Sequence, residues 1–210
     1  MATAPDSIDL HFPTPIYRAL LAGQPGMPDL DELDALCRSL ALDDEAGRRW
    51  CRKHGYAGYT SYASLDDLDW RFPAFASLGA LLDRHVAAFA KSLDYDLGRE
   101  RLKRDSLWVN VLPQGGSHGS HLHPLSVVSG TFYVAVPEGA SVIKFEDPRL
   151  SAMMAAPPRK AKAAPQNRSF VQVAPAPGTL LLWESFVRHE VPMNRSEEER
   201  ISISFNYRWR

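Results

Sequence analysis

Three histidines have spacings that suit a metal ion. His121 and His123 alternate within residues 117–124, so on an extended strand both imidazoles project from one face. Neutral imidazole is a common ligand of Fe, Zn, Cu and Ni. His189 lies farther along the chain, but the ends of different strands in a jelly roll converge at one mouth. The three residues predict a facial metal site that keeps open coordination positions.

A second candidate site binds an anion. Polar and apolar residues alternate from Arg200 to Tyr207, which predicts a strand with one polar face. If that face lines the interior, Arg200 can hold a carboxylate through two parallel N–H···O bonds, and Ser202 can add a hydroxyl donor. Tyr133 offers a further donor to the same carboxylate. The three residues predict a dicarboxylate anchor; the structural alternatives are an amphipathic surface strand and a core tyrosine.

The second half of the chain must supply the strands that position these residues. From about residue 106 the helical period gives way to alternation, with Leu107, Val109 and Val111 on one side. Pro- and Gly-containing turns separate the predicted strands, at 106–111, 127–136, 141–145, 169–173, 179–183 and 200–209. Short strands without intervening helices favour a jelly roll.

The first half is predicted to be mainly helical. Apolar residues recur at helical spacing in residues 29–42 and 75–97. We therefore expect a mainly β protein with N-terminal helices (α+β). One domain is expected to span 1–210, with 1–105 packing on a jelly-roll core at 106–210. Residues 151–168, rich in alanine, proline and basic residues, are interpreted as a mobile loop that could close over a substrate.

Composition narrows the range of partners and compartments. The net charge of −1 and the pI near 6.7 give no global field for nucleic acid or an anionic membrane. No segment approaches the roughly 20 apolar residues of a membrane span, and the N-terminus lacks a secretory signal. Cys37 and Cys51 form no CxxC pair. We expect a cytoplasmic protein that binds neither nucleic acid nor membrane; a homodimer is compatible with the sequence.

Several motifs in order resemble a family of small Fe(II)/2-oxoglutarate-dependent oxygenases. They are His121-x-His123, Ser-Gly-Thr-Phe-Tyr-Val at 129–134, Phe-Glu-Asp-Pro-Arg at 145–149, His189-Glu-Val-Pro and Arg200-Ile-Ser-Ile-Ser-Phe-Asn. The likeness covers roughly residues 106–210. The same ordered motifs are similar, more distantly, to those of prolyl-hydroxylase-type oxygenases. It implies a double-stranded β-helix, Fe(II) and 2-oxoglutarate as cofactors, and Arg200 as the 2-oxoglutarate arginine.

One position departs from the family pattern. Most such oxygenases have Asp or Glu two residues after the first histidine, where this chain has His123. A third imidazole leaves the site one negative charge short, which should weaken Fe(II) retention. Three readings stay open: a three-histidine site, a two-histidine site completed by Glu146 or Asp147, or a different metal. Strand geometry favours the first. His118 is a weaker fourth candidate, because the surrounding glycines indicate a loop.

The resemblance implies an oxidoreductase that hydroxylates or otherwise oxidises a small-molecule or peptide substrate. No catalytic residue beyond the metal centre is predicted, since the cofactor performs the chemistry while the protein orients and shields it. Two alternatives remain: a three-histidine, cupin-like metalloenzyme that does not use 2-oxoglutarate, and a noncatalytic metal- or small-molecule-binding module. No motif identifies the substrate.

Overall fold

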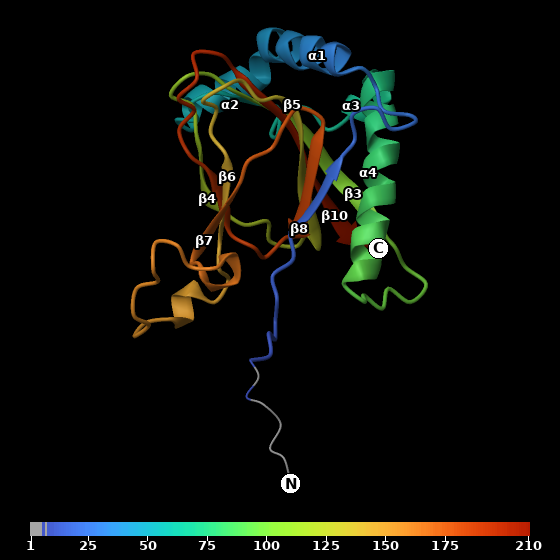
Figure 1. The fold of residues 1–210 in the computed structure, drawn as a ribbon. Helices are drawn as coiled ribbons and strands as arrows, with labels where there is room; N and C mark the ends of the chain where they lie inside the picture. The colour runs from blue at the N-terminus through green and yellow to red at the C-terminus, as the bar shows by residue number, and fades with distance from the viewer. Residues whose placement is uncertain (1–5, 7) are drawn as a thin grey trace.

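The computed structural model describes residue 6 and residues 8–210, and its strands form two antiparallel sheets (Figure 1). Within these residues the larger sheet has, in spatial order, β1 (Tyr17–Leu20), β8 (Thr179–Glu184), β5 (Val128–Ala135), β10 (Arg200–Trp209), β3 (Leu102–Leu112) and β2 (Tyr59–Thr60). The smaller sheet has β4 (His118–His121), β9 (His189–Val191), β6 (Ile143–Glu146) and β7 (Phe170–Val173). This arrangement confirms the predicted jelly roll.

The two faces of the larger sheet have different roles because side chains alternate along each strand. On β10, Ile201, Ile203 and Phe205 are fully buried in the core between the sheet and the helices. The alternate residues Arg200 and Ser202 point the other way, into a cavity between the two sheets. A second, smaller core joins the sheets, formed by Tyr133, Ile143, Phe145, Leu181, Trp183 and Val187.

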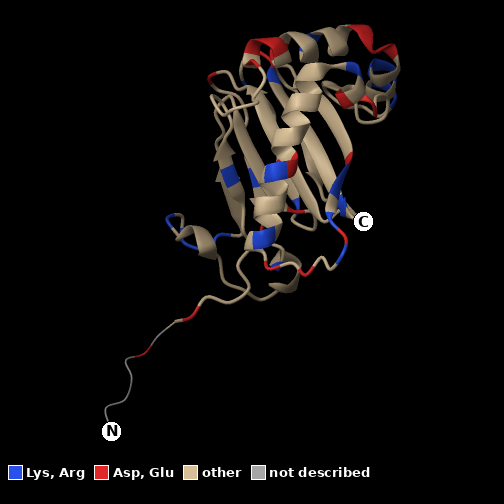
Figure 2. Cartoon of the chain, turned by 90° about the vertical axis from the view of Figure 1, so that its right-hand side faces the viewer, with Lys and Arg blue, Asp and Glu red and all other residues tan. Residues whose placement is uncertain are grey.

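Helices cover the outer face of the larger sheet. They are α1 (Leu30–Asp43), α2 (Glu45–Lys53), α3 (Leu68–Arg71) and α4 (Pro73–Ser92). Figure 2 shows α4 lying along the strands, and its apolar stripe, including Leu78, Leu82 and Val86, is almost completely buried. Pro73 at the first turn suits a helix start. Helices and larger sheet thus share one hydrophobic core.

The predicted helices were located closely but not to the residue. The helix expected at 29–42 is α1, whose N-cap Asp29 accepts a hydrogen bond from the Asp31 amide at 2.8 Å. The helix expected at 75–97 is α4, which ends earlier, since Leu93 caps it and Asp94 adopts a left-handed conformation with φ of 54°. None of the described helices is long and apolar enough to cross a membrane.

Two short 3-10 helices lie at the start of the segment 151–168 and near its end: η1 (Leu150–Ala152) and η2 (Pro165–Asn167). Together with residues 10–16 it borders a pocket of about 560 Å³ that none of the three candidate metal-binding histidines lines. The segment therefore lies beside a different cavity from the one in which a lid was expected.

Candidate metal centre and adjoining chambers

The fold brings His121, His123 and His189 together. One ring nitrogen from each lies within 4.8 Å of the others. His121 on β4 and His189 on β9 are direct cross-strand partners, with ring centroids 4.3 Å apart, and His123 follows two residues after the end of β4. The large sequence separation is bridged by strand pairing in the smaller sheet. This is the set of histidines that spacing predicted.

Backbone carbonyls orient two of these imidazoles. Nδ1 of His121 lies 2.7 Å from the Gly119 carbonyl oxygen, and Nδ1 of His189 lies 3.0 Å from that of Val187. If each Nδ1–H donates to its carbonyl, Nε2 keeps a free lone pair for a metal ion. His123 has a different partner, the side-chain amide of Asn206, 3.5 Å from its Nδ1.

Burial keeps these rings neutral. It lowers the pKa of His189 to about 3 and the pKa of His123 to about 4, and the nearby His121 acts in the same direction on both. Burial also lowers the pKa of His121. Only a neutral imidazole can donate a lone pair to a metal, so the three side chains are in the ligating state at neutral pH.

His118 lies beside the cluster but outside it. Its ring stacks on His121 with centroids 4.4 Å apart, and its Nδ1 is 3.3 Å from the Tyr56 hydroxyl. Among the described residues, the group of possible metal ligands contains three histidines without it.

The two acids that could have completed a two-histidine site are engaged elsewhere. A carboxylate oxygen of Glu146 lies 3.9 Å from Nε of Arg188, and Asp147 pairs with Arg149 at 2.8 Å. Both acids line the pocket beside segment 151–168, and neither belongs to the histidine group found in the described part of the chain. The geometry therefore favours a three-histidine donor set.

The predicted anion anchor is buried at the inner end of the same cavity. Arg200 is only 2% exposed; its Nε donates to the Ser141 carbonyl oxygen at 3.1 Å, and one terminal nitrogen donates to Ser202 Oγ at 3.4 Å. Its guanidinium carbon lies 5.0 Å from the centre of the Tyr133 ring. No acid within the described residues forms a salt bridge with Arg200.

Two neighbouring hydroxyls are also unsatisfied. In the part of the chain that is described, the buried hydroxyls of Tyr133 and Ser141 have no hydrogen-bond partner. Burial raises the pKa of Tyr133 to about 12, with Arg200 acting in the opposite direction, so the phenol remains a donor. A buried cation and a buried free donor are costly unless a ligand satisfies them. A carboxylate at this position would satisfy both, so the residues fit the 2-oxoglutarate that the sequence resemblance implies.

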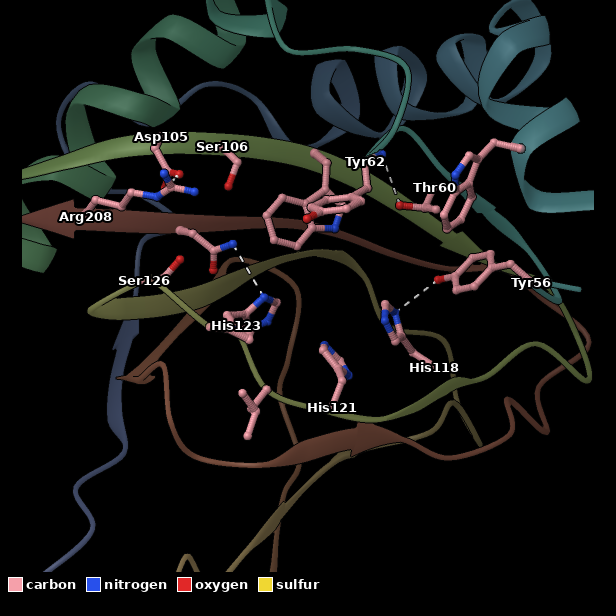
Figure 3. A pocket seen from close by; sticks show the side chains of 15 residues that line it. Tyr56, Thr60, Tyr62, Asp105, Ser106, His118, His121, His123, Ser126 and Arg208 are labelled. Carbon is pink, nitrogen blue, oxygen red and sulfur yellow. Dashed lines mark hydrogen bonds and ion pairs between the residues drawn. The ribbon is translucent and has the colours of Figure 1, made fainter. Parts of the chain in front are cut away.

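The histidine cluster separates two chambers. The inner one, between the sheets, extends from His189 to Arg200 and Tyr133. The outer one has a volume of about 590 Å³ (Figure 3). Side chains of Tyr56, Trp108, His118, His121 and His123 line both.

The sequence analysis did not identify most of the residues that line the outer chamber. Trp50 comes from α2, whereas Tyr56 and Tyr62 come from the Gly- and Tyr-rich segment on either side of β2. Gly- and Tyr-rich composition is the only signal that the sequence carries for this segment, and composition alone specifies no role. Trp108, by contrast, lies on β3, where alternation placed it opposite the apolar face.

Two facing antiparallel sheets with a histidine cluster at the end of the smaller one define a double-stranded β-helix metalloprotein. Residues 106–206, just under half of the chain, match a family model described as "Putative 2OG-Fe(II) oxygenase". This match confirms the resemblance seen in the motifs. Fe(II) and 2-oxoglutarate are the cofactors of the family, and its members are oxidoreductases. No curated protein matches the chain.

Solved structures support the same fold. The epimerase SnoN, crystallised with Fe3+, alpha ketoglutarate and nogalamycin RO, is 16% identical, with a TM-score of 0.61 over 93% of this chain and 79% of that one. A Pseudomonas putida prolyl-4-hydroxylase is 15% identical, with a TM-score of 0.56 over 94% of both chains. A 2OG-Fe(II) oxygenase family oxidoreductase from Burkholderia pseudomallei is 21% identical, but this chain spans only 57% of its length and the TM-score is 0.45 over 64% of this chain, so this likeness is partial and does not bear on the fold.

Proposed function

We propose that the protein is an Fe(II)- and 2-oxoglutarate-dependent oxygenase whose metal ligands are His121, His123 and His189. Arg200, with Tyr133 and Ser202, would bind the distal carboxylate of 2-oxoglutarate. The observation that carries the proposal is the pairing of the two sites. A cluster of neutral histidines opens into a cavity whose far end holds a buried arginine without an acidic partner.

The bound iron and 2-oxoglutarate would supply the oxidation: dioxygen and 2-oxoglutarate are consumed, carbon dioxide and succinate are released, and a substrate C–H bond becomes C–O–H. The chain's own residues bind and orient. Carbonyls of Gly119 and Val187 hold two imidazoles in the ligating tautomer. Arg200 and Tyr133 fix the inner end of the cosubstrate, and the apolar residues of the smaller core exclude water from that end.

Three neutral ligands set this centre apart from a centre with one carboxylate. The donor set cancels none of the charge of a divalent ion, so retention of Fe(II) depends more on the negative cosubstrate. We infer that metal and 2-oxoglutarate bind cooperatively, each strengthening the other.

The proposal extends to the compartment, the domain organisation and the class of substrate. We place the protein in the cytoplasm, in keeping with the free, buried Cys37 and Cys51. We propose a single domain because α1 and α4 share a core with the strands of the larger sheet. Its substrate would be a small molecule or peptide and not a nucleic acid, in keeping with a net charge near zero. A homodimer remains compatible with the sequence.

Anaerobic reconstitution tests the proposal. Purified protein is loaded with Fe(II) and 2-oxoglutarate, the charge-transfer absorption of the chelate is recorded, and succinate is measured after oxygen is admitted. We expect absorption and slow succinate release in the native protein, and neither in a His121→Ala/His189→Ala variant. Oxidation of a substrate without 2-oxoglutarate would favour the cupin-like alternative. Metal binding without succinate, over a broad substrate panel, would favour a binding module.

A further inference from the structure

The outer chamber has one wall of aromatic side chains. Trp50, Tyr56, Tyr62 and Trp108 line it from the helical half and β3, while His118, His121 and His123 line the side that leads to the proposed metal (Figure 3). Tyr62 packs edge-to-face on Trp108, with centroids 5.1 Å apart. Tyr62 is nevertheless 57% exposed, so much of its ring is free to contact a ligand.

Trp50 is similarly placed. His54 stacks on its indole, with ring centroids 4.3 Å apart and planes inclined by 25°. His54 is not among the residues that line the chamber, whereas Trp50 is. The indole therefore has one covered face and offers its remaining surface to the chamber. Indole and phenol surfaces favour flat or compact rings, which they contact by stacking or edge-to-face packing.

Charges in the chamber cancel. Of its described lining residues, Asp105 and Arg208 are the only acid and the only arginine or lysine, and they form an ion pair at 2.6 Å. The imidazoles of His118, His121 and His123 line the side toward the proposed metal. The other polar groups are uncharged: Thr60, Ser106, Ser126 and Asn206. A charged ligand would lose hydration here without gaining an unpaired counter-charge.

We propose that the substrate is an uncharged organic molecule that presents a ring to the outer chamber. The ring contacts Tyr62 and Trp50, and the oxidised C–H bond is on the ring or on the carbon attached to it, beside His121 and His123. In the balanced reaction, R–H, dioxygen and 2-oxoglutarate give R–OH, succinate and carbon dioxide. This inference rests on the proposed function for its chemistry, whereas its binding preference can be measured separately.

Three probes of one shape test the charge preference: benzamide, benzoate and benzamidine carry the same ring with zero, negative and positive charge. Binding is measured by ligand-observed NMR to protein loaded with Zn(II) and 2-oxoglutarate, and again to metal-free protein. We expect benzamide to bind at least about tenfold more tightly than either ion, because the chamber holds no unpaired charge. Pentanamide, which has no ring, should bind at least about fivefold more weakly than benzamide.

Variants locate the binding. Tyr62→Ser should weaken benzamide binding at least about fivefold, and because Tyr62 is largely exposed the variant should fold. Trp50→Ala should act in the same direction. Trp70→Ala is the matched control, since Trp70 is 86% exposed and lies outside the chamber lining. Tightest binding by benzamidine or benzoate, equal binding of all four probes, or binding indifferent to Tyr62→Ser would each overturn the proposal.

The two proposals fail differently. Selective benzamide binding by protein that never releases succinate would sink the oxygenase assignment and leave the chamber's preference intact. Succinate release by protein that does not prefer benzamide would leave the oxygenase assignment intact and overturn the proposed substrate class.

Discussion

The Arg200 guanidinium carbon lies 5.0 Å from the centre of the Tyr133 ring, and both side chains are buried at the inner end of one cavity. The guanidinium has no acidic partner in the described residues, and the phenol hydroxyl has no hydrogen-bond partner there. A buried cation without a counter-ion, beside a buried hydroxyl without an acceptor, does not stabilise the fold. The two groups are instead suited to bind an anion.

Arg200→Met tests the cation. We expect 2-oxoglutarate to bind at least about 100-fold more weakly, since two charge-assisted hydrogen bonds are lost. The metal-free variant should be as stable as the native protein or more so, because a buried unpaired charge is removed. Titration calorimetry and urea unfolding provide the two readouts. Arg149→Met, which removes an exposed arginine that lines another pocket, is the control. Unchanged 2-oxoglutarate affinity in Arg200→Met would refute the assignment.

Tyr133→Phe removes only the hydroxyl. Because that group has no partner in the unliganded protein, the free energy of unfolding should stay the same or rise by up to about 1 kcal/mol. Affinity for 2-oxoglutarate should fall by about fivefold, which corresponds to one neutral donor. Stability is read from urea denaturation and affinity from calorimetry. A clear loss of stability would mean that the hydroxyl already has a partner in the free protein.

His123→Asp restores the usual carboxylate. We expect Fe(II) to bind at least about tenfold more tightly than in the native protein, and His123→Ala to bind it at least about tenfold more weakly. Anaerobic competition with a chromophoric chelator measures both. Glu146→Gln and Asp147→Asn should leave metal affinity unchanged, because those acids pair with Arg188 and Arg149. If either weakened binding as much as His123→Ala, an acid would complete the site instead.

Acid should destabilise the metal-free protein. An unfolded histidine takes up a proton near pH 6.5, whereas burial holds the pKa of His118 and His123 at about 4 and that of His189 at about 3. Between these values the unfolded state binds more protons, so the free energy of unfolding falls as the pH falls, by up to about 1.4 kcal/mol per pH unit for each histidine. Urea unfolding at several pH values measures the slope. His189→Gln should reduce it and His54→Gln, on the surface, should not; equal slopes in all three proteins would contradict the prediction.

Asn206 should tune His123. A neutral His123 that ligates through Nε2 carries its proton on Nδ1, and the nearby Asn206 amide can accept a hydrogen bond from this N–H by turning its oxygen toward it. Ser129, whose hydroxyl lies 2.7 Å from Asn206 Oδ1, would then accept from the amide nitrogen. We expect Asn206→Leu to weaken metal binding by about tenfold and Asn206→Asp to retain it. Equal affinities for the two variants would show that the amide has no such role.

The sequence was informative where one strand or helix carries the whole pattern. The strand predicted at 200–209 has the bounds of β10, because polar and apolar residues alternate from Arg200 to Tyr207 and so specify both faces. Alternation alone therefore placed Arg200 and Ser202 together on the polar face, which is the face toward the cavity. The apolar stripe of α4 was equally clear in the sequence. The end of the helix was predicted too late, because the turn at Asp94 depends on one backbone conformation.

The remaining parts of the site could not be predicted from the sequence, because they depend on contacts between segments far apart in the chain. β9 has three residues, and its register with β4, which sets His189 opposite His121, leaves no periodic signal in either segment. α2 has few apolar residues, and only Gly47 and Cys51 are buried. The sequence therefore has no apolar stripe that would predict the helix that carries Trp50. The outer chamber depends on that helix meeting the segment around Tyr62, which only the folded chain brings about.

β4 is one of the two edge strands of the smaller sheet, and within the described residues it pairs in that sheet with β9 alone. A four-residue edge strand is held by few backbone bonds and opens easily. The same strand supplies His121 to the metal and His118 to the chamber wall. An ion shared by His121 and His189 would pin this edge as a cross-link does, and so complete the chamber wall.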